Sequence, residues 1–458
     1  MSDPTASLLT DPDQQDNDLK RSITGRLLFF YVLGDVLGSG IYVLIGSVAG
    51  AVGGAFWIAF AVGVSVATIT GLAYAELVTK YPQAAGAALY VSKAFKNQFL
   101  TFLIAFCMLS ASFAAAGSLA TGFASYFLEV WELPPELLLA LAFIVVLALV
   151  NFIGITESVV ANVVMTVIEV AGLIIIMVIG VIHVAQGNAD FGTLTQFEAS
   201  GKSPVFAVVA GVALAFFAMT GFENAANVAE ETVDPQRAFP RALVSGMVVA
   251  GILYVLVAMT AALTVPIGTL AGSDAALLEV VKADILPIPL GIMTIVFAVI
   301  AMIAITNTCL VALVTQSRIL YGMAREDVVP GVFGTIHRSR RSPWVALVFA
   351  AIVVGGLLLS GADLDRLVAV TVVFTLFIYA LVIVAALKLR NQDVDEGTFR
   401  ASATLLVAGI IGNATLLGYV IYTDPASLLW CAALLGVGLV LFVLEYLFGS
   451  RNSTKTGA

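Results

Sequence analysis

Charge is scarce in this sequence, since only 11% of its 458 residues are Asp, Glu, Lys or Arg, whereas 60% are hydrophobic. A soluble globular domain carries about 25% charged and about 45–50% apolar residues. The composition therefore excludes a soluble domain and predicts an integral membrane protein with several spans, with the lipid bilayer as its main partner. The net charge of −9 is acidic and gives no basis for nucleic-acid binding.

Cysteine and histidine are also few. Cys107, Cys309 and Cys431 are odd in number and lie far apart within apolar runs, which indicates no disulfide framework. His183 and His337 have no potential metal ligand at a useful spacing. We therefore expect packing roles for these five residues, and neither a metal nor a cofactor.

Motifs of soluble enzymes are missing or incomplete. Gly38-Ser39-Gly40 lacks the third glycine of a dinucleotide-binding fingerprint, and no strand precedes it. Gly201-Lys202-Ser203 lacks the first glycine of a phosphate-binding loop, because position 196 is Gln. The sequence contains neither HExxH nor GxSxG. Enzymatic activity is therefore not expected.

Long apolar runs make up most of the sequence. A helix needs about 20 apolar residues to cross a bilayer core about 30 Å thick. Twelve runs fit: Leu27–Ala49, Ala51–Val78, Phe99–Leu128, Leu137–Phe152, Val159–Val184, Val205–Ala229, Ala242–Val265, Ile288–Val314, Trp344–Leu359, Leu367–Leu387, Ala403–Tyr422 and Ser427–Phe448. The sequence thus predicts an all-α integral membrane protein with about twelve transmembrane helices.

The distribution of basic residues predicts the orientation. With twelve crossings and a cytoplasmic N-terminus, all 21 Lys and Arg residues except Lys202, Lys282 and Arg366 fall on the cytoplasmic side. The acidic segment Met1–Leu19 has no basic region before an apolar stretch, so we interpret it as a disordered tail and not as a signal peptide. We expect a multi-pass protein of the cell membrane with cytoplasmic tails at residues 1–26 and 450–458.

The first apolar run is interrupted by Gly38-Ser39-Gly40. Non-helical backbone is tolerated in a membrane only where it lines a protein cavity, and glycine permits such a break. The half-helix ends would expose carbonyls on one side and N–H groups on the other, which suits a zwitterion. The alternative is that these small residues only allow close helix packing.

A second interruption lies in the sixth run. Thr220-Gly221 is followed by Glu223, Asn224 and Asn227, which are too polar for contact with lipid. The first and sixth runs are corresponding helices of two five-helix halves, 27–185 and 205–388, with residues 402–449 forming two further helices. Breaks at matching places are a pointer to a transporter binding site at the bilayer midplane.

Four motifs give the chain a family resemblance: GSGIYVLIG in the first run, AYAELVTKYPQAAGAALYV after the second, GFENAANVAEETVDPQRAFPRA through the sixth and SRILYGMAREDVVP after the eighth. They resemble the amino acid-polyamine-organocation superfamily of permeases, in particular its bacterial and cationic amino acid branches. The resemblance implies a leucine-transporter-type fold: a five-plus-five inverted repeat with discontinuous helices 1 and 6, working by alternating access.

The same resemblance implies a substrate site. Ser39, Gly40 and Ile41 match positions whose N–H groups hold the substrate carboxylate. The carbonyls of five further residues would receive the α-amine: Leu37, Gly38, Phe217, Ala218 and Thr220, with Gly221 completing the second break. Phe217 also matches an aromatic gate position. Glu223 matches an acid that is a candidate for sensing protons or for meeting a basic substrate, as expected for a carboxyl within a membrane.

One position departs from the family. Where proton-coupled and sodium-independent relatives have a lysine in the fifth span, this chain has Glu169. Asn162, Thr166 and Glu169 recur on one helical face, so Glu169 is predicted to point into the bundle. It is a candidate to carry a coupled proton, or to ligate Na⁺ with Thr306, Asn307 or Thr308. The alternative is a protonated, purely structural Glu.

Asp35 lies four residues before Ser39 and shares its helical face. It is a candidate to complete a cation site or a gate, and equally to be a hydrated residue. Glu76, Glu230, Glu231 and Arg237 are interpreted as solvated helix ends, with a gate network as the alternative.

The sequence predicts a secondary transporter of amino acids or related amines, driven by protons. Three alternatives stay open: a Na⁺-coupled symporter, an amino acid or amine exchanger without ion coupling, and a membrane sensor that transports nothing. The sequence gives no indication of an oligomeric state.

Overall fold

The computed structural model describes residues 23–83, 86–131, 135–153, 159–197, 203–229, 231–325, 328–338, 340, 342–392 and 398–448, with the backbone alone for residues 159–162 and 448. Residues 1–22 of the predicted N-terminal tail, the whole tail 450–458 and Glu230 lie outside this part of the chain. Within the described residues the chain is helical, and its extended pairing is limited to a bridge between Ile23 and Thr232.

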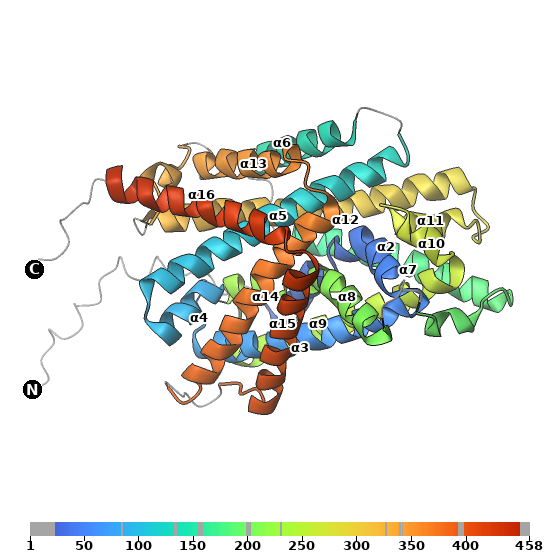
Figure 1. Ribbon diagram of the computed structural model, residues 1–458, viewed down its shortest axis with the longest axis horizontal. Helices are drawn as coiled ribbons and strands as arrows, with labels where there is room; N and C mark the ends of the chain where they lie inside the picture. The colour runs from blue at the N-terminus through green and yellow to red at the C-terminus, as the bar shows by residue number, and fades with distance from the viewer. Residues whose placement is uncertain are drawn as a thin grey trace, which may run out of the picture.

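The helices cover most of the chain (Figure 1). The α-helices are α1 (Gly25–Leu37), α2 (Gly40–Val52), α3 (Trp57–Lys80), α4 (Gly86–Phe95), α5 (Gln98–Leu128), α6 (Glu136–Ile153), α7 (Val159–Ala185), α8 (Pro204–Ala215), α9 (Pro235–Thr264), α10 (Ile267–Ala271), α11 (Ala276–Lys282), α12 (Leu290–Arg325), α13 (Trp344–Leu359), α14 (Leu364–Leu389), α15 (Ala403–Thr423) and α16 (Ser427–Phe448). Five 3₁₀ segments accompany them: η1 (Gly54–Phe56), η2 (Phe191–Thr195), η3 (Phe216–Met219), η4 (Phe222–Val228) and η5 (Gly331–Gly334).

Each predicted apolar run coincides with a helix or a broken helix, and the all-α membrane class is confirmed. Among the described residues, ten helices are long and apolar enough to cross a bilayer, and the bent pair α1 and α2 makes an eleventh. The apolar helix α13 has only 16 residues, about 24 Å at 1.5 Å per residue. The count of twelve therefore stays a prediction, as does the division into two inverted halves.

Local chemistry fixes several helix starts. The side chains of Thr24, Asn97 and Asp363 accept hydrogen bonds from the first turns of α1, α5 and α14. Pro235 occupies the first turn of α9, so this helix begins there and not at Ala242 as predicted. The prediction was wrong because hydropathy marks the apolar part of a helix and not the polar turns that continue it.

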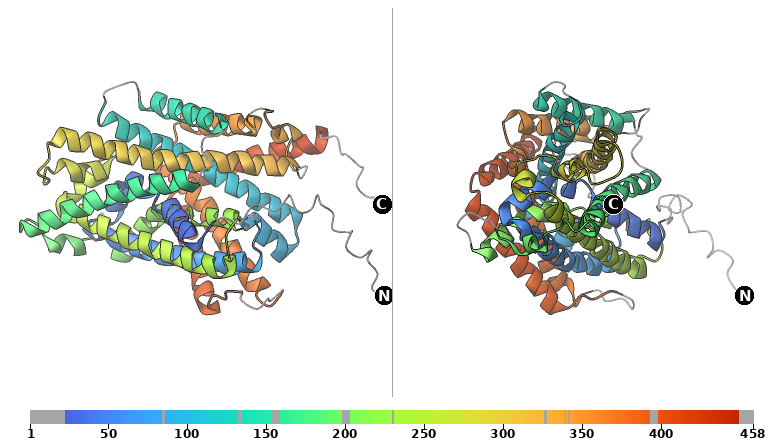
Figure 2. Two further views of the ribbon diagram at one scale, coloured as in Figure 1. Left: turned by 180° about the vertical axis from the view of Figure 1, so that it is seen from behind. Right: turned by 90° about the vertical axis from the view of Figure 1, so that its right-hand side faces the viewer.

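The helices form an elongated bundle (Figures 1 and 2). In Figure 1, α4 lies at one end of the long axis and α10 and α11 lie at the other. These elements were predicted on opposite sides of the membrane. Helices α6 and α13 lie side by side along one edge, while α2 and the C-terminal part of α1 are buried in the bundle.

Candidate functional site

The first break separates α1 from α2 by Gly38 and Ser39, and the two half-helices are bent by 41°. The Ser39 N–H donates to the Oγ1 of Thr308 at 3.1 Å. Within the described residues, no backbone hydrogen bond is donated by Gly40 or Ile41. The Ser39 hydroxyl is fully buried and has no hydrogen-bond partner in the described part of the chain. The start of α2 thus offers donor groups to a ligand.

The second break lies between η3 and η4. Thr220 is extended and Gly221 has φ +112°, a conformation that side chains rarely permit. The sixth run is thus discontinuous, as predicted, and the segments that flank its break are 3₁₀ turns. The hydroxyl of Thr220 donates to the carbonyl of Phe217 at 2.7 Å, which closes the last turn before the break.

The two breaks touch each other. A Cβ on Gly40 would overlap the Cα of Ala218, and a Cβ on Gly221 would overlap the carbonyl oxygen of Asp35. The Gly-Ser-Gly motif therefore does not serve packing alone, because the backbone is interrupted there and Gly40 also permits close packing.

A cavity of about 140 Å³ lies where the breaks meet α5, α12 and α14. A single water needs only about 10–15 Å³ by the same kind of measure, so the cavity has room for a larger molecule. Eleven predicted site residues line it: Asp35, Gly38, Ser39, Gly40, Phe217, Ala218, Thr220, Gly221, Glu223, Asn307 and Thr308.

Four predicted site residues do not line the cavity. Leu37 and Ile41 are fully buried in the half-helices, and Glu169 lies behind the wall. The Thr306 hydroxyl donates to the Met302 carbonyl of its own helix at 2.6 Å. Leu37 and Ile41 were predicted to act through their backbone groups. Burial of their side chains therefore leaves that role a prediction.

Sequence reasoning named no individual residue of α14 as part of the site. Thr371, Thr375 and Tyr379 all line the cavity. They recur every four residues within an otherwise apolar run, so they share one helical face. That spacing is the signal that could have identified them.

Several carbonyls predicted to receive an amine already accept hydrogen bonds. The carbonyl of Phe217 accepts from Thr220, and that of Ala218 accepts from the hydroxyl of Tyr254 at 3.2 Å. Among the hydrogen bonds of the described residues, none is accepted by the carbonyls of Leu37, Gly38 or Thr220. Of these three residues, Gly38 and Thr220 line the cavity, so their carbonyls are the acceptors most open to a ligand.

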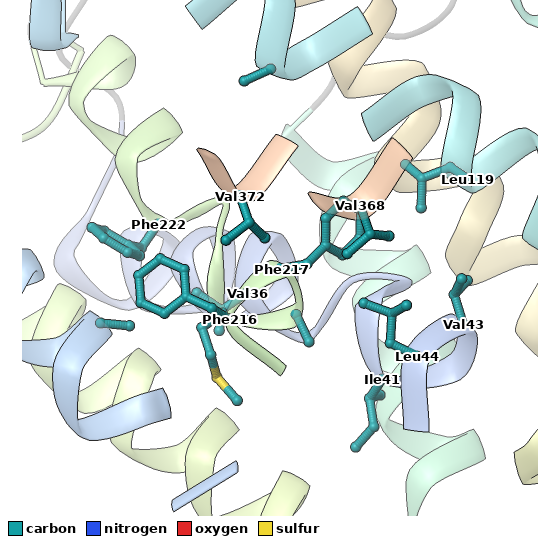
Figure 3. Packing of buried hydrophobic residues seen from close by; sticks show 14 of the residues in the cluster. Val36, Ile41, Val43, Leu44, Leu119, Phe216, Phe217, Phe222, Val368 and Val372 are labelled. Atoms are coloured by element: carbon teal, nitrogen blue, oxygen red, sulfur yellow. The ribbon is translucent and has the colours of Figure 1, made fainter. Parts of the chain in front are cut away.

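Glu223 is turned back toward the second break. Its Oε2 accepts from the hydroxyl of Tyr379 at 2.6 Å and from the Gly221 N–H at 2.8 Å. The rings of Tyr74, Phe222 and Phe216 surround Tyr379 with centroids 5.2–6.0 Å away. Figure 3 shows Phe216 and Phe222 together here, and Phe217 lying beside Val368 of α14.

Glu169 faces the bundle interior, as predicted. It is fully buried, and its Oε1 accepts from the Nδ2 of Asn307 at 3.2 Å, while its Oε2 has no hydrogen-bond partner among the residues that the structure describes. Its carbonyl accepts from the hydroxyl of Tyr42 at 2.7 Å. Because Asn307 also lines the cavity, a single side chain connects Glu169 to the site. The side chain of Asn162 lies outside the described residues.

Removal of the Ser39 hydroxyl should weaken substrate binding without unfolding the protein. A hydrogen bond contributes about 0.5–1.5 kcal/mol net, so Ser39→Ala should raise KM about two- to tenfold with little change in maximal rate. Ser110→Ala is the matched control, because its hydroxyl is equally buried and unpartnered but does not line the cavity. Initial uptake rates against substrate concentration measure both, and an equal KM in the two variants would contradict the prediction.

Glu76 is not the solvated helix end that the sequence predicted. It is 3% exposed, its Oε2 accepts from the Ala401 N–H at 2.9 Å, and its Oε1 lies 3.9 Å from the Nε of Arg390. The prediction was wrong because its partners, Arg390 and Ala401, lie in the α14–α15 connection, more than 300 residues away along the chain. By contrast, the pair of Arg237 and Asp234 is exposed, as expected.

Substitution of Glu76 should lower stability in a graded way. Glu76→Gln keeps an acceptor for Ala401 but loses the ion pair, whereas Glu76→Leu loses both interactions. We expect a loss of about 1 kcal/mol for Gln and about 2–3 kcal/mol for Leu. Thermal unfolding in detergent measures this, with Glu445→Gln on α16 as the control. Equal midpoints for both Glu76 variants and the parent would show that the contacts contribute nothing.

Comparison with known proteins finds similarity to amino acid permeases and related transporters over most of the chain. The sequence profile of the amino acid permease family matches residues 25–457. A branched-chain amino acid permease of Bacillus subtilis (strain 168) is 27% identical over 96% of this chain and 95% of its own length. A methylthioribose transporter of the same organism is 25% identical over 91% and 94%. The chain is 28% identical to cationic amino acid transporter 9, chloroplastic, of Arabidopsis thaliana over 69% of this chain, but covers only 58% of that relative.

Proposed function

The chain belongs to the amino acid permease family, a family of membrane transporters and not of enzymes, and from this premise we propose that it carries an amino acid or a related amine across the cell membrane. Transport would proceed by alternating access in a leucine-transporter-type fold with both termini in the cytoplasm. The substrate would occupy the cavity between the two breaks.

One observation carries this proposal: unbonded donor and acceptor groups of the two breaks lie at or next to the same cavity. The buried Ser39 hydroxyl and the N–H groups of Gly40 and Ile41 suit a carboxylate at the start of α2. The carbonyls of Leu37, Gly38 and Thr220 suit an ammonium group. A free α-amino acid carries both groups.

The charge of the wall supports an amine. Among the described residues that line the cavity, Asp35 and Glu223 are acidic and none is Lys, Arg or His. Such a wall favours a zwitterion or a cation over an anion. Relatives are named for branched-chain amino acids, cationic amino acids and methylthioribose, so these classes form the substrate panel.

We propose proton coupling through Glu169. A fully buried carboxyl with one unpartnered oxygen, linked to the cavity by Asn307, can take up a proton with little rearrangement. Na⁺ is the alternative ion, with Asn307 and Thr308 as neighbouring oxygen ligands.

Counterflow into proteoliposomes tests the function. Radiolabelled amino acids, polyamines and methylthioribose are offered in turn, with imposed pH or Na⁺ gradients. Uptake of an amino acid or amine that a pH gradient drives supports the proposal, and uptake driven by Na⁺ alone replaces the proton. Exchange that no gradient accelerates indicates an exchanger. Uptake of methylthioribose alone, or of nothing in the panel, would overturn the assignment.

A further inference from the structure

Tyr254 of α9 lies behind both breaks. Its hydroxyl oxygen is 2.5 Å from the carbonyl oxygen of Val36 and 3.2 Å from that of Ala218. Tyr254 is fully buried, and its ring packs edge-on against Phe60 of α3 at 5.9 Å. A residue that does not line the cavity therefore contacts the backbone of two segments that do.

The two carbonyls have a common property. In a continuous α-helix, the carbonyl of Val36 would accept from the N–H of Gly40, and that of Ala218 would accept from the N–H of Phe222. Both bonds are lost, because a break lies between each pair. A buried carbonyl without a donor is costly, and one hydroxyl supplies a donor where both would otherwise lack one.

Two other buried tyrosines, Tyr126 and Tyr42, have a different arrangement. The hydroxyl of Tyr126 donates to the carbonyl of Tyr42 at 2.9 Å, which lies within α2 and has a helical partner there. The hydroxyl of Tyr42 likewise donates to Glu169, within α7. The Tyr126 and Tyr42 hydroxyls bond to carbonyls that already accept a helical hydrogen bond. The Tyr254 hydroxyl bonds to carbonyls that have lost theirs.

A hydroxyl has a single hydrogen, so Tyr254 cannot donate fully to both carbonyls at once. If either break is displaced, the strength of the hydrogen bond that Tyr254 donates to the other break changes. Since Gly40 and Ala218 are also in direct contact, the breaks are connected both side to side and through α9.

We propose that Tyr254 is the positioning residue of the substrate site: its hydroxyl holds the two chain breaks in register so that they move as one unit. This inference rests on the proposed function, because it assigns the breaks to the substrate site. It predicts that loss of the hydroxyl loosens both breaks together and weakens substrate binding.

Hydrogen–deuterium exchange of the purified full-length protein tests the inference without a substrate. In Tyr254→Phe, peptides covering residues 36–44 and 216–224 should both exchange about three- to tenfold faster than in the parent, the range expected for one lost hydrogen bond. Tyr126→Phe is the matched control, and its exchange in these peptides should be unchanged. Faster exchange in only one peptide, in neither, or equally in both variants would overturn the proposal. Failure of Tyr254→Phe to fold, where Tyr126→Phe folds, would also overturn it.

Uptake kinetics give the second readout. Tyr254→Phe should raise KM about three- to tenfold with a maximal rate within twofold of the parent, whereas a merely structural role would lower the maximal rate through loss of folded protein. An unchanged KM in a transporting variant would overturn the positioning role and leave the proposed function intact. A parent that transports nothing would overturn the proposed function, while the exchange experiment would still decide whether Tyr254 holds the breaks in register.

Discussion

Gly221→Ala should abolish transport. Gly221 has φ +112°, and a Cβ at this position would overlap the carbonyl oxygen of Asp35. The added methyl group therefore meets both an unfavourable backbone conformation and a clash with another backbone segment. We expect a cost of at least about 3 kcal/mol, concentrated where the breaks meet. That energy corresponds to a loss of about 100-fold or more in uptake rate.

Gly322→Ala is the matched control for this change. Gly322 lies within α12, and nothing lies within 4 Å of a Cβ built on it. Alanine in a helix interior is favoured over glycine by up to about 1 kcal/mol, so the control should be neutral or slightly stabilised. Initial uptake rates and thermal midpoints measure both variants. Normal uptake by Gly221→Ala would show that the second break does not need this geometry.

The sequence was sufficient for features that local chemistry determines. Apolar runs located the spans, and Gly38-Ser39-Gly40 and Thr220-Gly221 located both breaks, because irregular backbone and polar residues are tolerated at membrane depth only beside a protein cavity. The spacing of Thr166 and Glu169 placed Glu169 toward the bundle, where it is fully buried. In each case the signal lies within one or two turns of chain.

Features that depend on distant partners could not be predicted in this way. Tyr254 bonds to Val36 across 218 positions, and Glu76 bonds to Ala401 across 325. The carbonyl of Ala218 was predicted to be open to an amine, but Tyr254 already donates to it. A single sequence shows which backbone groups a break releases, but not which side chain satisfies them.

Glu169→Gln should separate exchange from accumulation. Glutamine has nearly the shape of a protonated glutamate and can keep the contact with Asn307, so the fold and the cavity should persist. It cannot release a proton, so the variant should lose coupling and keep exchange. The Oε2 of Glu169 has no hydrogen-bond partner, which means that the new amide group displaces no existing bond.

The expected effect on accumulation is large, because each pH unit of the gradient raises the attainable accumulation ratio of the substrate about tenfold. One pH unit corresponds to about 1.4 kcal/mol per proton, so a transporter that couples one proton to one substrate can accumulate it about 100-fold across two pH units. The parent and the control Glu445→Gln should approach that ratio, whereas Glu169→Gln should equilibrate its substrate near a ratio of about 1 while counterflow continues. Accumulation by Glu169→Gln equal to that of the parent would assign the carboxyl a structural role. Accumulation that follows an Na⁺ gradient in the parent and is lost in the variant would instead make Glu169 part of a cation site, since the same carboxylate that binds a proton can ligate Na⁺.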